Sequence, residues 1–165
     1  MKPIKWILAV GAVASALLAL NVSALDFGLN SGFFQTTPSG DPPWATVNIK
    51  NAGQGVEVSI TVSGGNNIGS LTELYMNFDQ SKDATKLQVA SSMEGVSADT
   101  ITRADRFKAD ADGFFDLRVK FEGLNAGETK TFTITSAGNN LDANDFNFFP
   151  EATRCNSLHF GLGVQ

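Results

Sequence analysis

The sequence predicts an all-β protein whose strands form an antiparallel β-sandwich of about seven to nine strands, preceded by a signal-peptide helix. Short runs of residues alternate between apolar and polar with period two, as half-buried strands do. Turn signals rich in Gly, Asn and Asp separate these runs, and no long helical periodicity lies between them. A jelly-roll and an immunoglobulin- or cohesin-like arrangement both fit this spacing.

The first residues have the pattern of a secretory signal peptide. Lys2 and Lys5 give a positive start, an uncharged apolar run follows, and small residues ending at Ala24 match the pattern that signal peptidase reads. The run is shorter than the roughly 20 residues of a membrane-spanning helix, which disfavours the alternative of an uncleaved anchor. The sequence therefore predicts a signal peptide over 1–24 and a single domain over 25–165. The expected location is secreted: periplasmic, cell-surface or extracellular.

Seven segments of the predicted domain alternate as strands do. The clearest is 55–62, where Val56, Val58 and Ile60 alternate with polar residues. The predicted strands are residues 44–50, 55–62, 71–78, 85–90, 114–121, 128–135 and 157–164. Residues 91–111 lack this alternation and are expected to hold a short helix around 104–108 or a long loop.

The net charge limits the classes of partner that the protein could bind, and the cysteine content limits its disulfides. The chain has 12 Lys and Arg against 17 Asp and Glu, a net charge of −5, and loss of the leader would remove two lysines. A negative surface disfavours nucleic acid and anionic membranes as partners. Cys155 is the single cysteine and cannot form an intramolecular disulfide. We expect it to be a small buried hydrophobe, with pairing between chains or a modification as alternatives.

The usual catalytic signatures are missing from the sequence. The single histidine, His159, lies in an alternating run, and no nucleophile elbow, phosphate-binding loop or His-Glu-x-x-His motif occurs. Paired carboxylates stay open as an alternative, because a glycosidase needs only two acids at the right separation. The sequence favours a protein that is not an enzyme.

One acidic turn has spacing that fits a calcium site. In residues 108–116 (KADADGFFD), close carboxylates flank a Gly-assisted bend, and calcium prefers such oxygen ligands. A second loop containing NFD supplies further oxygens. The candidate calcium ligands are Asp110, Asp112, Asp116, Asn77 and Asp79. The alternative is an Asp-Gly turn with solvated acids.

Aromatic residues raise a carbohydrate-binding alternative. Sugar-binding sandwiches use exposed aromatic faces beside polar groups, and Trp44 and Tyr75 are the candidate ligand-binding residues. This hypothesis requires one of the two rings to lie flat and exposed.

Four segments together resemble a known family. They are residues 74–79 (LYMNFD), 108–116 (KADADGFFD), 128–135 (ETKTFTIT) and 143–148 (ANDFNF). Their order is similar to that of a family of secreted bacterial β-sandwich proteins of poorly defined function, often associated with PEP-CTERM sorting by exosortase. The resemblance implies export to the cell surface or to extracellular polymer, and implies no catalytic residues. The final residues, GLGVQ, lack the family's Pro-Glu-Pro sorting tail, so its anchoring is not expected to carry over.

We therefore expect a secreted, non-enzymatic binding or structural protein, with calcium as a candidate stabilising ion. The alternatives are a carbohydrate-binding module and a small carbohydrate-active hydrolase. The expected partner is an extracellular polysaccharide or another surface protein. Nucleic acid is not expected, and the membrane is expected only during export.

Overall fold

The computed structural model describes residues 24–29, 41–64, 70–90, 95–99, 104–109, 113–147 and 162–164. Within these residues the chain forms eleven strands and two short 3₁₀ helices. In chain order they are β1 (Ala24–Gly28), β2 (Ala45–Ala52), β3 (Gly55–Val62), β4 (Leu71–Met76), η1 (Ala84–Lys86), β5 (Leu87–Ala90), β6 (Val96–Ala98), β7 (Phe107–Ala109), β8 (Gly113–Phe115), β9 (Leu117–Leu124), β10 (Thr129–Ser136), η2 (Ala143–Phe146) and β11 (Leu162–Val164).

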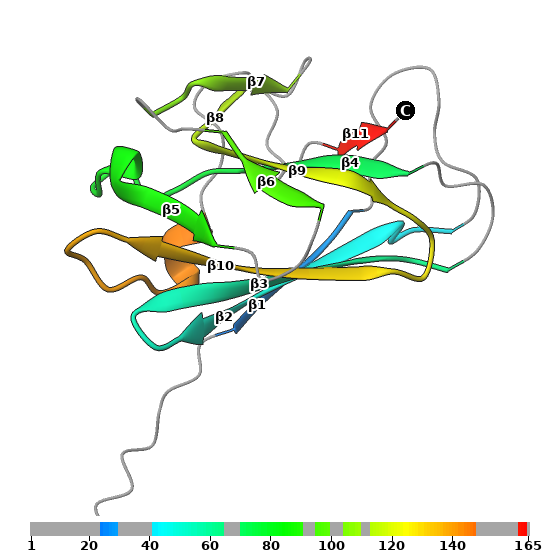
Figure 1. Ribbon diagram of the computed structural model, residues 1–165, viewed down its shortest axis with the longest axis horizontal. Coiled ribbons are helices and arrows are strands. Elements are labelled where there is room, and N and C mark those ends of the chain that lie inside the picture. The colour runs from blue at the N-terminus through cyan, green and yellow to red at the C-terminus, as the bar shows by residue number, and fades with distance from the viewer. Residues whose placement is uncertain are drawn as a thin grey trace, which may run out of the picture.

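All strand pairs are antiparallel, and they form three open sheets. The larger sheet has the order β1-β2-β3-β10-β5, the smaller has β11-β4-β9-β6, and β7 and β8 form a separate hairpin. Figure 1 shows the two main sheets as two layers, with the hairpin on the outer side of the smaller one. The predicted all-β class and antiparallel pairing are therefore confirmed.

The predicted number of about seven to nine strands is too low. Strands β1, β6 and β7 were not predicted, because runs of three to five residues show too little alternation to be recognised. The single strand expected over 114–121 is instead β8 and β9, separated by a bend at Asp116. Of the last predicted strand, residues 157–164, the described residues contain only the part that forms β11.

The core lies between the two main sheets and is built from the alternating residues. In β3, Val56, Val58 and Ile60 are buried while the residues between them are half-buried. In β9, Leu117 and Val119 are buried in the same way. Each such side chain contributes roughly 1.5–3 kcal/mol by leaving water. The apolar face of each main sheet therefore packs against the other and forms the core.

The turn between β2 and β3 is predicted correctly. The first residues after this turn lie close to β10, the other neighbour of β3. Gly53 has a φ of 63°, a conformation that glycine adopts at little cost. Gly55 then begins β3 at a point where the neighbouring backbone leaves no room for a side chain. A Cβ atom at Gly55 would lie 2.4 Å from the carbonyl oxygen of Ile134.

Gly55→Ala should therefore lower the free energy of unfolding by about 2 kcal/mol, since two paired strands must separate to admit the methyl group. Urea denaturation would measure the change. Gly64→Ala is the matched control, because a Cβ there meets nothing within 4 Å, and we expect a change within about 0.5 kcal/mol. Equal effects of the two substitutions would contradict the tight approach of Ile134.

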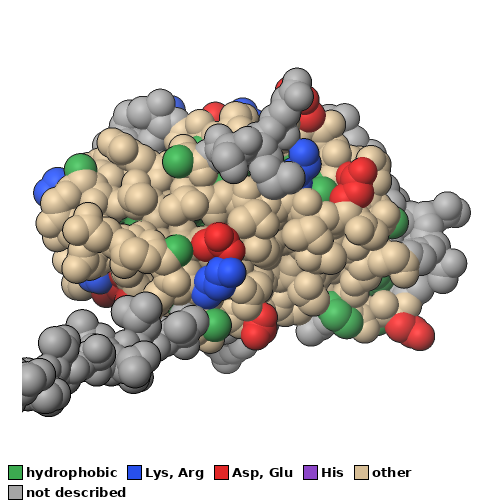
Figure 2. All heavy atoms as spheres, turned by 60° about the horizontal axis from the view of Figure 1, so that its bottom comes forward, with side chains coloured by type: hydrophobic (Ala, Val, Ile, Leu, Met, Phe, Trp, Pro, Cys, Tyr) green, Lys and Arg blue, Asp and Glu red, His purple; other side chains and the backbone are tan. Residues whose placement is uncertain are grey.

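The outer face of the larger sheet is polar and mostly uncharged. Ser59 and Thr131 share a hydrogen bond of 2.9 Å across β3 and β10, and Thr61 and Thr129 share one of 2.8 Å. Lys50 and Glu57 form an ion pair of 2.7 Å across β2 and β3. Figure 2 shows this side of the molecule as a broad area of uncharged polar side chains and backbone with few charges. Such a face suits a sheet that contacts water on one side.

The segment for which a helix or a loop was expected contains a strand. Residues 107–109 form β7, which pairs with β8 so that Phe107 lies opposite Phe115. Both rings are buried, and the helix predicted around 104–108 is wrong. The reason is tertiary: the hairpin covers apolar surface on the smaller sheet, which local sequence does not reveal.

No helix among the described residues is long and apolar enough to cross a membrane. The predicted signal peptide, apart from Ala24, lies outside the described residues, as do Cys155 and His159.

Candidate functional site

An open groove of about 460 Å³ lies on the outer side of the smaller sheet, between the β7–β8 hairpin and β9. Three of its five lining residues are cationic and one is a carboxylate. The lining residues are Asp99, Arg106, Phe107, Lys108 and Arg118. We call this the hairpin groove. On a chain with net charge −5, it is a local concentration of positive charge.

Arg118 lies at the centre because of strand alternation. Its neighbours Leu117 and Val119 are buried in the core, so the guanidinium projects to the outer face of β9. Tyr75 of β4 is its cross-strand partner. Asp99 follows β6 directly, and its N–H donates to the carbonyl of Arg118 at 3.2 Å. Three strands therefore hold these side chains in place.

The guanidinium of Arg118 joins a network of charged groups. Its Nε donates to Asp99 Oδ2 at 2.5 Å, and its Nη1 lies 3.5 Å from Glu73 Oε1. Lys120 Nζ lies 3.2 Å from Asp99 Oδ1, so Asp99 accepts from two cations. Tyr75 completes the network by donating its hydroxyl to Glu73 Oε2 at 2.5 Å. The network orients Arg118 at the base of the groove.

These contacts change the ionisation of the groups involved. Burial by itself would raise the pKa of Asp99, but hydrogen bonds from Arg118 and Lys120 outweigh it and hold the pKa below the usual 3.8. Burial would lower the pKa of Arg118, and hydrogen bonds to Tyr75 and Asp99 outweigh that effect, so its pKa is raised. Burial, then the bond to Glu73, raises the pKa of Tyr75. Asp99 and Arg118 are therefore a charged pair at neutral pH.

The network should make stability sensitive to acid. Because the pKa of Asp99 is lower in the folded chain than in the unfolded one, its contribution is present above about pH 4 and is lost as pH falls through the folded pKa. In Asp99→Asn, part of the loss of stability below about pH 4 should disappear. Urea midpoints across this range would measure it. Asp26→Asn, on the other sheet, controls for removing one acid, and identical pH profiles for wild type and Asp99→Asn would contradict the pairing.

The ring of Phe107 lines the groove, and further aromatic rings pack beneath the hairpin. The guanidinium carbons of Arg106 and Arg118 lie 5.7 and 5.4 Å from the centroid of the Phe107 ring, within the range of cation–π attraction. Below the hairpin, the rings of Tyr75 and Phe115 lie 5.6 Å apart and tilted. Buried aromatic packing thus fixes the hairpin on the sheet and sets the shape of the groove.

The exposed rim of the hairpin carries Lys108 and Phe114, which are cross-strand partners. Phe114 is 46% exposed and is the large hydrophobic side chain that stands out on the described surface. Sequence reasoning did not select Phe114. The alternation of the strand could have indicated it, because burial of Phe115 turns the side chain of Phe114 to the opposite, outer face.

A second open groove, of about 490 Å³, lies at the other end of β9. Two carboxylates, Glu122 and Glu128, line it together with Gly95, Gly123, Asn125, Thr129 and Lys130. Glu128 Oε2 accepts the backbone N–H of Asn125 at 2.8 Å, which closes the turn before β10. Two carboxylates, those of Glu122 and Glu128, therefore share one concave surface.

The candidate calcium ligands are only partly described. Asp110 and Asp112 lie outside the described residues, and the calcium site stays a prediction. Asp116 is 3% exposed, and both of its oxygens accept backbone N–H groups. Asp79 Oδ1 accepts the N–H of Ser81 at 2.8 Å, and Asn77 is buried. The described residues contain no group of three or more His, Cys, Asp or Glu side chains placed to hold a metal ion.

Instead, segments far apart in the sequence meet around Asp116. Its Oδ2 accepts the N–H of Phe78 at 2.9 Å, and Asp79 N–H donates to the carbonyl of Asp145 at 2.8 Å. The rings of Phe78 and Phe146 lie 5.3 Å apart. Three of the four segments that carry the family resemblance thus come together in a structural cluster.

Neither predicted sugar-binding ring forms an exposed platform. Trp44 is 5% exposed and Tyr75 is 6% exposed. Trp44 lies between strands, with its N–H donating to Leu29 and its carbonyl accepting from Ser63. Tyr75 is covered by the hairpin through Phe115. The expectation that either ring lies flat and exposed is therefore wrong, although Tyr75 belongs to the network beneath the hairpin groove.

Comparison with protein-family models, with curated proteins and with solved structures gave no match to this chain. The resemblance described above therefore depends on its short segments alone.

Proposed function

We propose that the protein is an exported, non-enzymatic binding protein whose binding surface is the hairpin groove. The observation that carries this proposal is the groove itself, where Arg106, Lys108 and Arg118 converge on an otherwise acidic chain. Binding sites are concave and contain a few convergent polar groups, and this groove meets both criteria. The smaller sheet supplies Arg118 and the hairpin supplies Lys108, so the groups come from paired strands on two sides of the groove.

The finer fold belongs to the same proposal. The two main sheets are stacked with the apolar core between them, and the chain passes from one to the other between β3 and β4 and again before β5. This exchange supports a β-sandwich of jelly-roll or immunoglobulin-like type.

The proposal that the protein is exported depends on the signal peptide expected over residues 1–24. N-terminal sequencing of protein recovered outside the cytoplasm should therefore begin at Leu25. Protein that retains Met1 there would contradict cleavage.

A titration followed by NMR tests the binding function. The cleaved protein, labelled with ¹⁵N, would be exposed to a panel of acidic and neutral polysaccharides and acidic peptides. We expect amide shifts to concentrate at residues 106–108, 114 and 118. Shifts elsewhere on the surface, or no shifts with any member of the panel, would overturn the proposal.

The second groove supports one competing function, a small carbohydrate-active hydrolase. Glu122 and Glu128 line one open groove, as a pair of catalytic carboxylates would. Release of reducing ends from a polysaccharide, abolished by Glu122→Gln and retained by Lys108→Gln, would favour it over the binding protein. Glu128 is the weaker target for substitution, because it also closes the turn at Asn125.

A further inference from the structure

We infer that the hairpin groove recognises a sugar carrying a carboxylate, as part of an acidic saccharide. This inference rests on the proposed function and adds the chemical class of the ligand. Three observations carry it: a groove lysine, Lys108, without an ion pair among the described residues, a modest total charge of the groove, and an exposed ring, Phe114, that is the cross-strand partner of that lysine.

The cation available to a ligand is Lys108. The charge of Arg118 is matched within the protein by Asp99 and Glu73. Lys108 is exposed, lines the groove, and forms no ion pair with any described residue. A carboxylate in the groove would therefore contact Lys108 first and experience Arg118 at longer range. This arrangement suits one acidic group at a time.

The charge of the whole chain excludes a dense polyanion. Three cations and one carboxylate line the groove, but the protein as a whole is negative. A ligand of high charge density, such as nucleic acid, would be repelled by the rest of the surface. A saccharide with one carboxylate per sugar places its charge at the groove and neutral hydroxyl groups elsewhere. The groove, at about 460 Å³, lies within the usual size range of small-ligand sites.

Phe114 supplies the contact for the sugar ring itself. It lies directly opposite Lys108 in the hairpin and is 46% exposed. Cross-strand partners have Cβ atoms roughly 5 Å apart, so one sugar can reach both side chains. The apolar face of a sugar ring packs on an aromatic ring, while its carboxylate reaches the ammonium group. An acidic peptide would use the lysine and leave the phenyl ring without such a partner.

The test compares related ligands on the intact, cleaved protein. Isothermal titration would use oligogalacturonate, the same oligomer with its carboxylates methyl-esterified, and an acidic peptide of equal charge. We expect oligogalacturonate to bind at least tenfold more tightly than the ester or the peptide, with weaker binding at high salt. Lys108→Gln and Phe114→Ser should each weaken binding about tenfold. Both residues are exposed, so an unchanged melting temperature would show that folding is intact.

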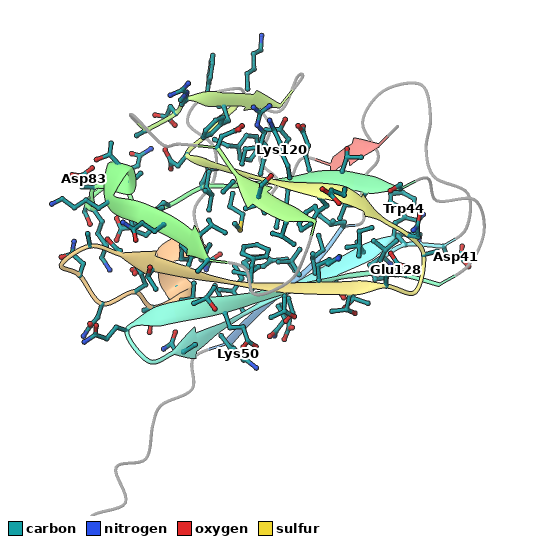
Figure 3. All side chains as sticks on the ribbon, in the orientation of Figure 1. Asp41, Trp44, Lys50, Asp83, Lys120 and Glu128 are labelled. Atoms are coloured by element: carbon teal, nitrogen blue, oxygen red, sulfur yellow. The ribbon has the colours of Figure 1, made fainter. Side chains whose placement is uncertain are left out.

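Lys50→Gln is the matched control, because it also removes one lysine from a strand. Figure 3 shows Lys50 on the side of the molecule opposite Lys120 and the smaller sheet, and its substitution should leave affinity unchanged. Equal binding of ester and acid at the groove would overturn the carboxylate inference and leave the binding function standing. Tighter binding of the peptide than of oligogalacturonate would overturn the inference that the ligand is a sugar. No binding by any probe or panel member would overturn both proposals.

Discussion

Asp116→Ala should lower the free energy of unfolding by about 3 kcal/mol, because it leaves one buried and one part-buried backbone donor without an acceptor. Asp116 Oδ2 accepts the N–H of Phe78 at 2.9 Å, and Oδ1 accepts the N–H of Asp105 at 2.8 Å. The second bond also holds Asp105 in a left-handed conformation, with a φ of 52°. A buried donor that loses its partner costs about 1–3 kcal/mol, and the part-buried N–H of Asp105 adds a smaller cost to that of Phe78. Urea denaturation would measure the loss.

Two further variants make this prediction specific. Asp116→Asn keeps one acceptor oxygen of similar shape, so its effect should be about half as large. Asp26→Ala removes a carboxylate from an exposed position in β1, and we expect a change within about 0.5 kcal/mol. If Asp116→Ala were no more destabilising than Asp26→Ala, the carboxylate would not be the acceptor that links these segments.

Phe146→Ala should cost about 3–5 kcal/mol, the usual range for removing a fully buried phenyl ring. Phe146 is 1% exposed and packs against Phe78 at the end of the core, where η2 closes the two sheets. The helix is held rigidly by Asp142, whose side chain accepts the N–H of Asn144 while Asp145 accepts the N–H of Asp142. The surroundings therefore cannot easily collapse into the space. Denaturation in urea and the melting temperature would both report the loss.

Phe114→Ala provides the matched comparison for the ring. It removes the same atoms from an exposed position, so it should change the free energy of unfolding by less than about 0.5 kcal/mol. A small effect of Phe146→Ala, similar to that of Phe114→Ala, would mean that η2 does not close the core as described.

The sequence predicts the long strands well, because burial on one side of a sheet imposes period-two alternation. Residues 55–62 show this most clearly, and β3 has those bounds. Burial of Val58 and Ile60 follows from the same pattern. The short strands contain too few residues to show this alternation. In β7, the buried ring of Phe107 packs on a surface that other strands provide.

The site was harder to predict, because alternation tells which side of a strand a residue occupies but not whether a further layer covers that side. Tyr75 does project outward from β4, yet the hairpin lies over it. Lys108 and Phe114 become neighbours only through the pairing of β7 with β8. Asp116 fits a metal-binding spacing in the sequence, while in the fold its oxygens accept backbone hydrogen bonds. Long-range pairing decides each of these outcomes.

The pairing of β3 with β10 has a consequence for the timing of folding. The centre of the larger sheet joins residues 55–62 to residues 129–136, so it cannot assemble until most of the polypeptide has been synthesised. Topologies dominated by such distant pairings fold on timescales of roughly milliseconds to seconds. A nascent chain of this design therefore lacks the centre of its larger sheet until residues 129–136 have been made.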